Sequence, residues 1–357
     1  MKKKNDKVSA GVKEIARLAN VSIATVDRVI HKREGVSEKT KARIEAIIQK
    51  LNYQPNILAQ RLALASRGTI RIAALLPNVS EETEFWQAPL DGIDQAAGEI
   101  RQYNVHIERF FFDQNDRQSF FKQVRRLSKT LPDGVLLSPI FPEESMILIR
   151  TLEDAGVPYI MINSEIVGFE SPHYIGPDIF HSGYLAAQLI DYCIDSHQQV
   201  LVANISGDID NNYAVAQVED GLRAYFKDHR LPNTIISLKT TQTDYPSIAR
   251  RMDKLLRTEK NIGAILVTNS RVSGVAKYLE KTGISHITLL GYDFVKDNVD
   301  YLKRGVIDFL ICEKPQEQGY RGIMALFQHL VYSNPTEKKY LMPIDIITKE
   351  NCEFYRN

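Results

Sequence analysis

The sequence is poor in cysteine, and its three cysteines are far apart. Cys193, Cys312 and Cys352 form no CxxC pair, so neither a disulfide framework nor a zinc site is expected, and a reducing compartment is the default. Long apolar runs are also missing. No stretch approaches the roughly 18 apolar residues of a membrane span, and no apolar core follows the basic N-terminal run as in a signal peptide. We therefore expect a soluble, cytoplasmic protein that does not associate with membranes.

The motifs of common enzyme classes are absent as well. No GxGxxG opens a helix, and neither GxxxxGK[ST] nor GxSxG occurs. The eight histidines show neither HExxH nor another metal-binding spacing. Asp208 and Asp210 resemble the DxD motif of metal-dependent transferases, but a two-residue pattern in a loop is expected by chance. We therefore predict a protein that is not an enzyme, with no catalytic residue, no metal site and no cofactor.

Charge, by contrast, is abundant and unevenly distributed. The net charge of the 357 residues is only +1, yet residues 1–68 hold 15 Lys and Arg against 6 Asp and Glu. The rest of the chain holds the remaining 30 basic and 38 acidic residues. This division predicts a short segment that binds a polyanion, joined to a larger, mildly acidic part. A chain of this length has room for two or three domains.

Apolar residues in the basic segment recur at the spacing of three short helices. The first spans roughly 13–19, and Asn20 after it tolerates the left-handed conformation of a tight turn. Ser22 is suited to cap a second helix, and a third starts near Ser37. The residues expected to face the shared core are Ile15, Ala16, Ala19, Val26, Val29, Ile30, Ile44, Ile47, Ile48 and Leu51. Those expected on the outer face of the second helix are Ile23, Ala24, Asp27, Arg28 and His31.

Three such helices predict a helix-turn-helix domain whose second helix enters a DNA major groove. Arg28 suits guanine O6 and N7, and Ile23 or Ala24 suits a thymine methyl group. The alternative is a three-helix bundle that docks on protein, because helix-turn-helix geometry is also used without DNA. In that case the large domain would be a carbohydrate-binding sensor or an enzyme that acts on sugars.

A close resemblance to the DNA-binding headpiece of the LacI/GalR (lactose/galactose repressor) family runs through VKEIARLANVSIATVDRVIHKREGVSEKTKARIEAIIQKLNYQPNILAQRLA. The most specific pieces are A-x-x-A-x-V-S-x-x-T-V-x-R-V from Ala16 to Val29, V-S-x-x-T from Val36 to Thr40, and L-N-Y-x-P-N from Leu51 to Asn56. The resemblance implies that Ser22 and Thr25 meet phosphates while Ile23, Ala24 and Arg28 face bases. Asp27 departs from the family's usual small hydroxyl residue, so it either accepts from cytosine N4 or pairs with His31.

The resemblance continues into a hinge helix at 56–64. In the family this helix folds on DNA and pairs with its twin in the minor groove, and Leu62 stands where the family has a leucine that wedges between base pairs. Leu64 departs from the small residue usual there. The DNA-binding residues that we predict in total are Ser22, Ile23, Ala24, Thr25, Asp27, Arg28, His31, Asn56 and Leu62.

From residue 70 onward, short apolar strands alternate with amphipathic helices, which is typical of doubly wound parallel α/β domains. Strands are expected at 70–76, 105–112, 134–139, 157–162, 200–205, 234–239, 263–268, 287–291, 306–311 and 342–347. Ten strands favour two parallel-sheet subdomains with a cleft between them. Because ligands of such sheets bind at the carboxyl ends of strands, the polar and aromatic residues that follow the strands indicate a sugar site.

This part of the chain resembles the type I periplasmic-binding-protein fold that the family fuses to its headpiece. The matching pieces include LLGYD from Leu289 to Asp293 and GVPYIMIN from Gly156 to Asn163. The resemblance places crossings between subdomains near Tyr174, Cys312 and Leu341. The effector-binding residues it implies are Phe85, Trp86, Asn163, Tyr245, Asn269, Asp293 and Glu313. The family's sugar-clamping arginine is missing near Ala216, which favours a sugar derivative or an oligosaccharide as ligand.

Together these features predict a repressor of carbohydrate-utilisation genes that works as a homodimer on a near-palindromic operator and senses a sugar-like effector. Release of DNA by the effector is the expected direction, and a corepressor acting the opposite way is the alternative. The predicted parts are a helix-turn-helix headpiece at 1–55, a hinge at 56–69 and an effector-binding and dimerisation domain at 70–357. Its subdomains comprise 70–174 with 313–341, and 175–312 with 342–357.

Overall fold

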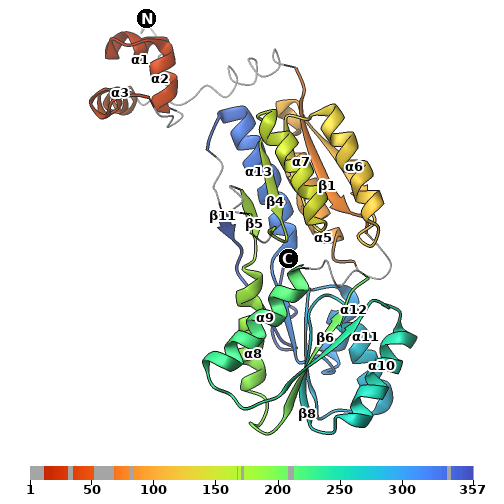
Figure 1. The fold of residues 1–357 in the computed structure, drawn as a ribbon. Helices are drawn as coiled ribbons and strands as arrows, with labels where there is room; N and C mark the ends of the chain where they lie inside the picture. Colours follow the sequence, from red (N-terminus) through yellow and green to blue (C-terminus); the bar gives the residue numbers. More distant parts are fainter. Residues whose placement is uncertain are drawn as a thin grey trace, which may run out of the picture.

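A computed structural model describes residues 12–30, 35–51, 68–79, 84–166, 168–169, 173–207, 213–335 and 339–356 (Figure 1). At the N-terminal end lie three short helices: α1 (Val12–Ala19), α2 (Ile23–Ile30) and α3 (Glu38–Lys50). Asn20 has a φ of 52°, the left-handed turn expected there. Ser37 caps α3 by accepting from the backbone N–H of Thr40. Ile15, Val26 and Ile44 are fully buried between the helices, so each helix turns one apolar face inward.

The upper lobe in Figure 1 is built on a parallel sheet with the strand order β11-β5-β4-β3-β1-β2. Helices α6 and α7 pack on one face of this sheet, and α5 and α13 pack on the other. Its strands are β1 (Ile70–Pro77), β2 (Val105–Phe112), β3 (Gly134–Leu137), β4 (Tyr159–Ile162), β5 (Tyr174–Gly176) and β11 (Lys339–Leu341). Its helices are α5 (Gln87–Ile100), α6 (Arg117–Thr130), α7 (Pro142–Asp154) and α13 (Pro315–Tyr332), with a 3-10 turn, η1 (Arg101–Tyr103), after α5.

The lower lobe repeats the design with the strand order β12-β10-β9-β8-β6-β7. Its strands are parallel except for β12, which runs antiparallel to β10. The strands are β6 (Gln199–Ile205), β7 (Ile235–Thr240), β8 (Ile262–Val267), β9 (Thr288–Tyr292), β10 (Phe309–Cys312) and β12 (Asp345–Ile347). The helices are α8 (Ile179–Asp191), α9 (Tyr213–Asp228), α10 (Tyr245–Thr258), α11 (Val272–Thr282) and α12 (Lys296–Lys303).

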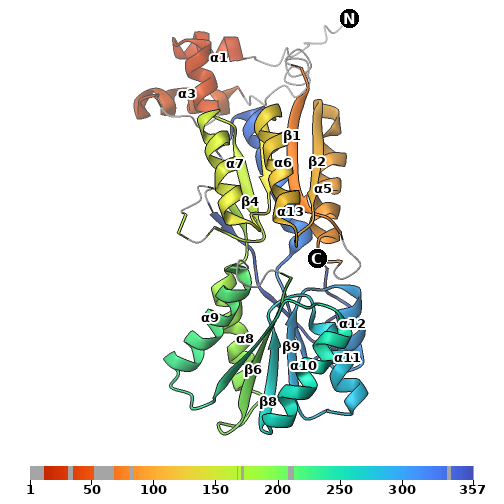
Figure 2. The same cartoon turned by 45° about the vertical axis from the view of Figure 1, so that its right-hand side comes forward.

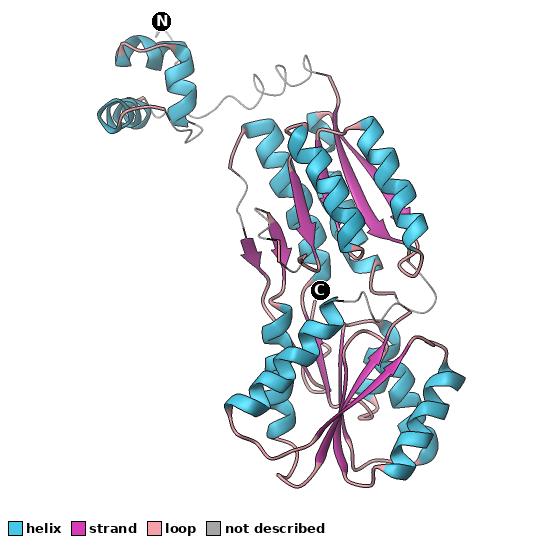
Figure 3. Cartoon of the chain, viewed as in Figure 1, coloured by secondary structure: helices cyan, strands magenta, loops and turns pink. Residues whose placement is uncertain are grey.

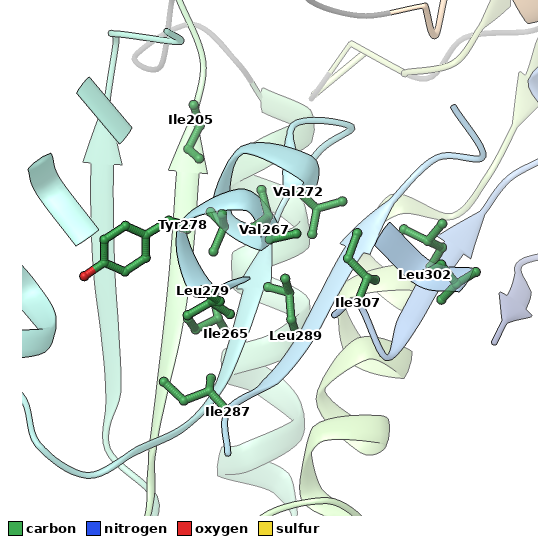
Figure 4. Close-up of a cluster of buried hydrophobic side chains, with 14 of the residues drawn as sticks. Ile205, Ile265, Val267, Val272, Tyr278, Leu279, Ile287, Leu289, Leu302 and Ile307 are labelled. Carbon is green, nitrogen blue, oxygen red and sulfur yellow. The ribbon is translucent and has the colours of Figure 1, made fainter. Parts of the chain in front are cut away.

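Each lobe has apolar side chains on both faces of its sheet. In the lower lobe α8 and α9 cover one face, and α10, α11 and α12 cover the other. Figure 4 shows the second of these layers, where Tyr278 and Leu279 of α11 lie against Ile265 and Val267 of β8. Strands buried on both faces read as continuous apolar runs, which is why the sequence predicts them well.

The chain passes between the lobes three times, after β5, after β10 and after β11 (Figures 1 and 2). The colouring in Figure 3 shows each lobe as strands between layers of helices, with the C-terminus close to the junction of the lobes. The predicted fold class is confirmed, with a small helical headpiece followed by two parallel α/β subdomains. In the part of the chain that the structure describes, no helix is long and apolar enough to cross a membrane.

Two strands of the upper sheet are not predicted by the sequence. β5 and β11 have only three residues each and pair with one another at the end of the upper sheet, where Lys339 is level with Tyr174. Such short strands carry no alternation that a sequence can reveal. They lie in crossing segments, and their pairing depends on bringing together residues more than 160 positions apart.

Candidate functional site

The headpiece presents an apolar and basic surface on its second helix. Ile23 is 49% exposed, although burying an isoleucine side chain is normally favourable, and Ala24 and Arg28 are exposed beside it. At the start of α2, the Ser22 hydroxyl accepts from the backbone N–H of Thr25, and the two hydroxyls lie 2.9 Å apart. This surface has the features that a major groove requires: hydroxyls at a helix N-terminus, an exposed methyl-rich patch and a guanidinium.

Four of the predicted DNA-binding positions cannot be placed. The side chain of Asp27 and the whole of His31, Asn56 and Leu62 lie outside the described residues. Their roles stay predictions that rest on the family resemblance. Ile23, Ala24 and Arg28 are exposed on the second helix, and Ser22 and Thr25 lie at its N-terminus.

Between the two lobes lies a cavity of about 170 Å³. Residues from both lobes line it, most of them where a strand ends and the next helix begins. Six of the seven predicted effector-binding residues line this cavity: Phe85, Trp86, Asn163, Asn269, Asp293 and Glu313. The volume suits one small ring-shaped molecule rather than a long chain.

The upper wall of the cavity is aromatic and apolar. Trp86 precedes α5, is 4% exposed, and donates from its indole nitrogen to Gln114 Oε1 at 3.0 Å. Phe85 stands edge-on to the Trp86 ring, with 4.9 Å between ring centroids, and keeps more of its surface open. Ile140 and Phe141 continue this wall. Fixed aromatic rings of this kind can stack on the C–H face of a sugar.

The lower wall is polar and rigidly held. Asn269 donates to the Ile205 carbonyl at 2.7 Å and accepts from the Arg271 backbone N–H at 3.1 Å, so its amide is fixed between two neighbouring loops. Asn163, from the upper lobe, has a φ of 71°. A non-glycine residue in this left-handed region is uncommon and is found often at binding sites.

Two carboxylates lie at the deep end of the cavity. Asp293 directly follows β9, and Glu313 directly follows β10, the neighbouring strand. Burial raises the pKa of Glu313 to about 7, although a hydrogen bond from Ser182 opposes this shift. Burial, and then the charge of Glu313, raise the pKa of Asp293 well above its usual range. Both carboxyl groups therefore hold their protons more tightly than exposed carboxyl groups do, and perturbed pKa values of this kind are common at functional sites.

Two buried amides, neither of which the sequence indicated, position these loops. Asn298 of α12 is fully buried, and its amide nitrogen donates to the carbonyls of Ser270, Tyr292 and Asp293. Its oxygen accepts from the Ser273 N–H at 3.2 Å. One side chain thus holds together the loops that follow β8 and β9.

Gln318 holds two segments together in the same way where the lobes join. Its side chain is 1% exposed and donates to the Glu313 carbonyl at 2.7 Å. Its oxygen accepts from the Asn163 N–H at 2.9 Å. Nothing in the local sequence distinguishes Gln318 or Asn298 from a surface amide on a helix, because their partners are brought close only by the fold.

Arg271 is a cleft residue that the sequence analysis also missed. The expected arginine is absent near Ala216, but Arg271, which precedes α11, lines the cavity with its guanidinium 3.5 Å from the Ile205 carbonyl. The cavity therefore contains an arginine that comes from a different element than the family resemblance implies.

Tyr245 does not belong to this group, and its predicted place in the cleft is corrected. It begins α10 and lies on the outside of the lower lobe, where the ammonium groups of Lys277 and Lys281 are 4.4 and 4.9 Å from its ring centre. Tyr245 follows β7, the edge strand of the lower sheet, whereas the cavity lies over the central strands.

Comparison with known families agrees with this architecture. Residues 11–56 match the family described as bacterial regulatory proteins, lacI family, and residues 72–333 match the periplasmic binding protein domain. The chain belongs to the LacI family. Its homologues are transcription regulators, and the family assigns this protein to DNA-binding transcription regulation.

Individual relatives and solved structures match most of the length of the chain. The transcriptional regulator GalR of Escherichia coli is 26% identical over 301 residues, which cover 80% of each chain. The crystal structure of a LacI transcriptional regulator from Bacteroides fragilis superposes with a TM-score of 0.74 and 27% identity, over 81% of this LacI-family chain and all of that one. A Burkholderia graminis solute-binding protein in complex with D-arabinose superposes with a TM-score of 0.71 at 18% identity, over 81% and 99% of the two chains.

Proposed function

We propose that this LacI-family protein is a repressor of carbohydrate-utilisation genes whose DNA affinity is controlled by a small sugar-like effector in the cleft. The observation that carries the proposal is the cavity itself. Aromatic rings, fixed amides and two carboxylates line it, and these residues come from both lobes. A sugar ring has an apolar C–H face and a rim of hydroxyls, so it complements both walls at once. The arabinose complex of a structural neighbour supports this choice of ligand class.

On the DNA side, the protein binds its operator as a homodimer, and the α2 surface of each protomer contacts the bases. Ile23 and Ala24 pack on thymine methyl groups, and Arg28 pairs with a guanine, while Ser22 and Thr25 hold phosphates. Two-fold symmetry of the protein implies a near-palindromic operator. Operator binding of this kind places the protein in the cytoplasm, with the DNA.

Coupling follows from the position of the cavity between lobes. A ligand that contacts both walls stabilises one spacing of the lobes over others, and the hinge at 56–69 connects the upper lobe to the headpiece. We propose that the effector-bound spacing is incompatible with the paired hinges, so the effector releases DNA. Release requires only that the effector bind one arrangement more tightly, by roughly 1–3 kcal/mol.

Two variants separate the DNA-binding and effector-binding roles. Arg28→Ala is expected to weaken operator binding by about 1–3 kcal/mol and to relax the preference at one base pair, without changing effector affinity. Asp293→Ala is expected to leave operator affinity intact and to abolish release by the effector. Fluorescence anisotropy with a labelled operator measures both properties.

Each variant has a result that contradicts its assignment. If Arg28→Ala weakens binding to operator and to random DNA equally, the residue contacts phosphate and does not read a base. If Asp293→Ala still releases the operator at the same effector concentration, the effector site lies elsewhere. Lys296→Ala, an exposed change on α12 three residues from Asp293, is the matched control and is expected to alter neither property.

A further inference from the structure

The chemical class of the effector can be narrowed from the charges around the cavity. Among the residues that the structure describes, four charged ones line it: Glu165, Arg271, Asp293 and Glu313. Glu165 forms an ion pair with Lys339 at 2.6 Å, so its charge is already balanced. Among the described residues no Lys, Arg or His forms an ion pair with Asp293 or Glu313. The deep end of the cavity therefore holds two carboxylates without a partner cation.

Three cations are close to these carboxylates in sequence or line the same cavity: Lys296, Lys314 and Arg271. Lys296 is exposed on α12 and is not among the residues that line the cavity. Lys314 follows Glu313 directly, but its ammonium donates to the Arg356 carbonyl at 2.6 Å and lies 3.1 Å from Asp345. Arg271 lines the same cavity, and one nitrogen of its guanidinium lies 3.5 Å from the Ile205 carbonyl; it forms no ion pair with Asp293 or Glu313. The pKa of Asp293 is shifted by burial and by the charge of Glu313, and the pKa of Glu313 by burial against a hydrogen bond from Ser182, with no part for Lys314 or Arg271.

Two further segments adjoin cavity-lining residues along the chain. Residues 80–83 and 208–212 precede cavity-lining residues along the chain and lie outside the described part. Their sequences, SEET and DIDNN, contain four acidic residues and no Lys or Arg. No Lys or Arg therefore occurs in either of these two segments of the sequence.

We propose that the effector is a sugar that carries an ammonium group, such as an aminohexose, and that Asp293 and Glu313 together hold this group. The proposal rests on the sugar-binding role proposed above for the cleft. Burial disfavours the ionised form of both carboxyl groups, and the hydroxyl groups of a neutral sugar supply no positive charge that would offset this. One ammonium has three N–H donors, so it bonds to both carboxylates and also neutralises their repulsion. The aromatic wall and the amides of Asn163 and Asn269 then hold the ring.

The test uses the full-length protein and nine sugars. Glucosamine, galactosamine and mannosamine are each titrated beside the neutral parent hexose and the N-acetyl derivative, which keeps the ring and removes the charge. Calorimetry gives the affinities, and thermal unfolding confirms that each variant is folded. We expect at least one aminohexose to bind about ten-fold or more tightly than both of its uncharged counterparts.

Isosteric variants assign that preference to the two carboxylates. Glu313→Gln and Asp293→Asn are each expected to reduce the preference about ten-fold. Glu165→Gln lines the same cavity but removes a carboxylate that is already paired with Lys339, so the preference is expected to survive. The proposal is overturned if a neutral hexose binds as tightly as its amino form, if the preference persists in both variants, or if none of the three aminohexoses binds.

Operator binding, measured with each sugar in parallel, separates this inference from the function on which it rests. Release of the operator by a neutral hexose would leave the sugar-controlled function intact and reject only the ammonium group. Aminohexose binding without any change in operator affinity would support the site chemistry and reject control by that sugar.

Discussion

Single side chains at the deep end of the cavity set both its chemistry and its stability. Glu313 has its pKa raised to about 7, mainly by burial. A carboxyl whose pKa is higher in the folded than in the unfolded state binds its proton more tightly when folded. The protonated Glu313 therefore makes its whole contribution to stability below the pKa of the unfolded state, near 4.5. This contribution is lost as the pH rises through the folded-state pKa of about 7.

This reasoning gives a prediction for Glu313→Gln. The free energy of unfolding of the wild type is expected to fall relative to that of the variant by roughly 1–3 kcal/mol between about pH 5 and pH 8, since one pKa unit corresponds to about 1.4 kcal/mol. Urea unfolding at the two pH values measures this difference. Parallel pH profiles for the two proteins would show that Glu313 titrates normally in the folded state.

Asn298 is the second residue on which the site depends. Asn298→Ala leaves the carbonyls of Ser270, Tyr292 and Asp293 without this donor, so we expect a loss of roughly 2–4 kcal/mol in the free energy of unfolding and weaker effector binding. Lys296→Ala, on the exposed side of the same helix, is expected to cost less than about 0.5 kcal/mol. Equal stability of both variants, measured by urea unfolding, would contradict the bracing role.

Some of these residues can be predicted from the sequence, and others cannot. Asp293 and Glu313 follow apolar strands directly, so the rule that ligands bind at strand ends is enough to find them. Asn298, Gln318 and Arg271 act through contacts between distant segments, which no local pattern reports. Tyr245 follows a strand as well, but that strand is at the edge of its sheet, and the order of strands is a property of the fold rather than of the local sequence.

At the level of whole elements, the loops after β2 and β6 meet across the cavity. Gly207, which follows β6, lies directly against the side chain of Asn115 in the loop after β2, leaving no room for a Cβ atom. This contact joins the two lobes on one side of the cavity. A larger side chain at position 207 would have to displace the Asn115 amide or keep the lobes apart; no unusual backbone conformation is involved.

Gly207→Val is therefore expected to hold the lobes apart. We predict a loss of about ten-fold or more in effector affinity, with operator affinity in the absence of effector unchanged. Adding Asn115→Gly removes the obstructing side chain, so the double variant is expected to bind the effector as the Asn115→Gly single variant does. Calorimetric titration of the four proteins checks this. An equal loss in the presence of Asn115→Gly would mean that steric contact with Asn115 is not the cause.

The elements differ in how far a sequence determines them. The long strands are apolar throughout, because helices cover both faces of each sheet, and they were predicted to within a few residues. The three headpiece helices were predicted from apolar spacing and from Ser22, Asn20 and Ser37 at their ends. β5 and β11 were missed because three residues with no alternation become strands only through pairing with each other.

In the molecule as a whole, a basic headpiece is joined to an acidic body that encloses a cavity. Residues 1–68 are strongly basic, which favours phosphate contacts and makes operator binding sensitive to salt. The body contributes the cavity between its lobes that we propose as the effector site. The central claim is that the protein binds a specific DNA sequence and releases it when a sugar binds in the cavity.

Capture of genomic DNA tests that claim most directly. The full-length protein and Arg28→Ala are each incubated with sheared DNA of the source organism, with and without its carbohydrate extract, and the bound fragments are sequenced. The account predicts one shared near-palindrome beside carbohydrate genes, bound by the wild type, released by the extract and depleted with Arg28→Ala. Fragments without any shared sequence under both conditions, or the same fragments recovered equally by Arg28→Ala, would contradict it.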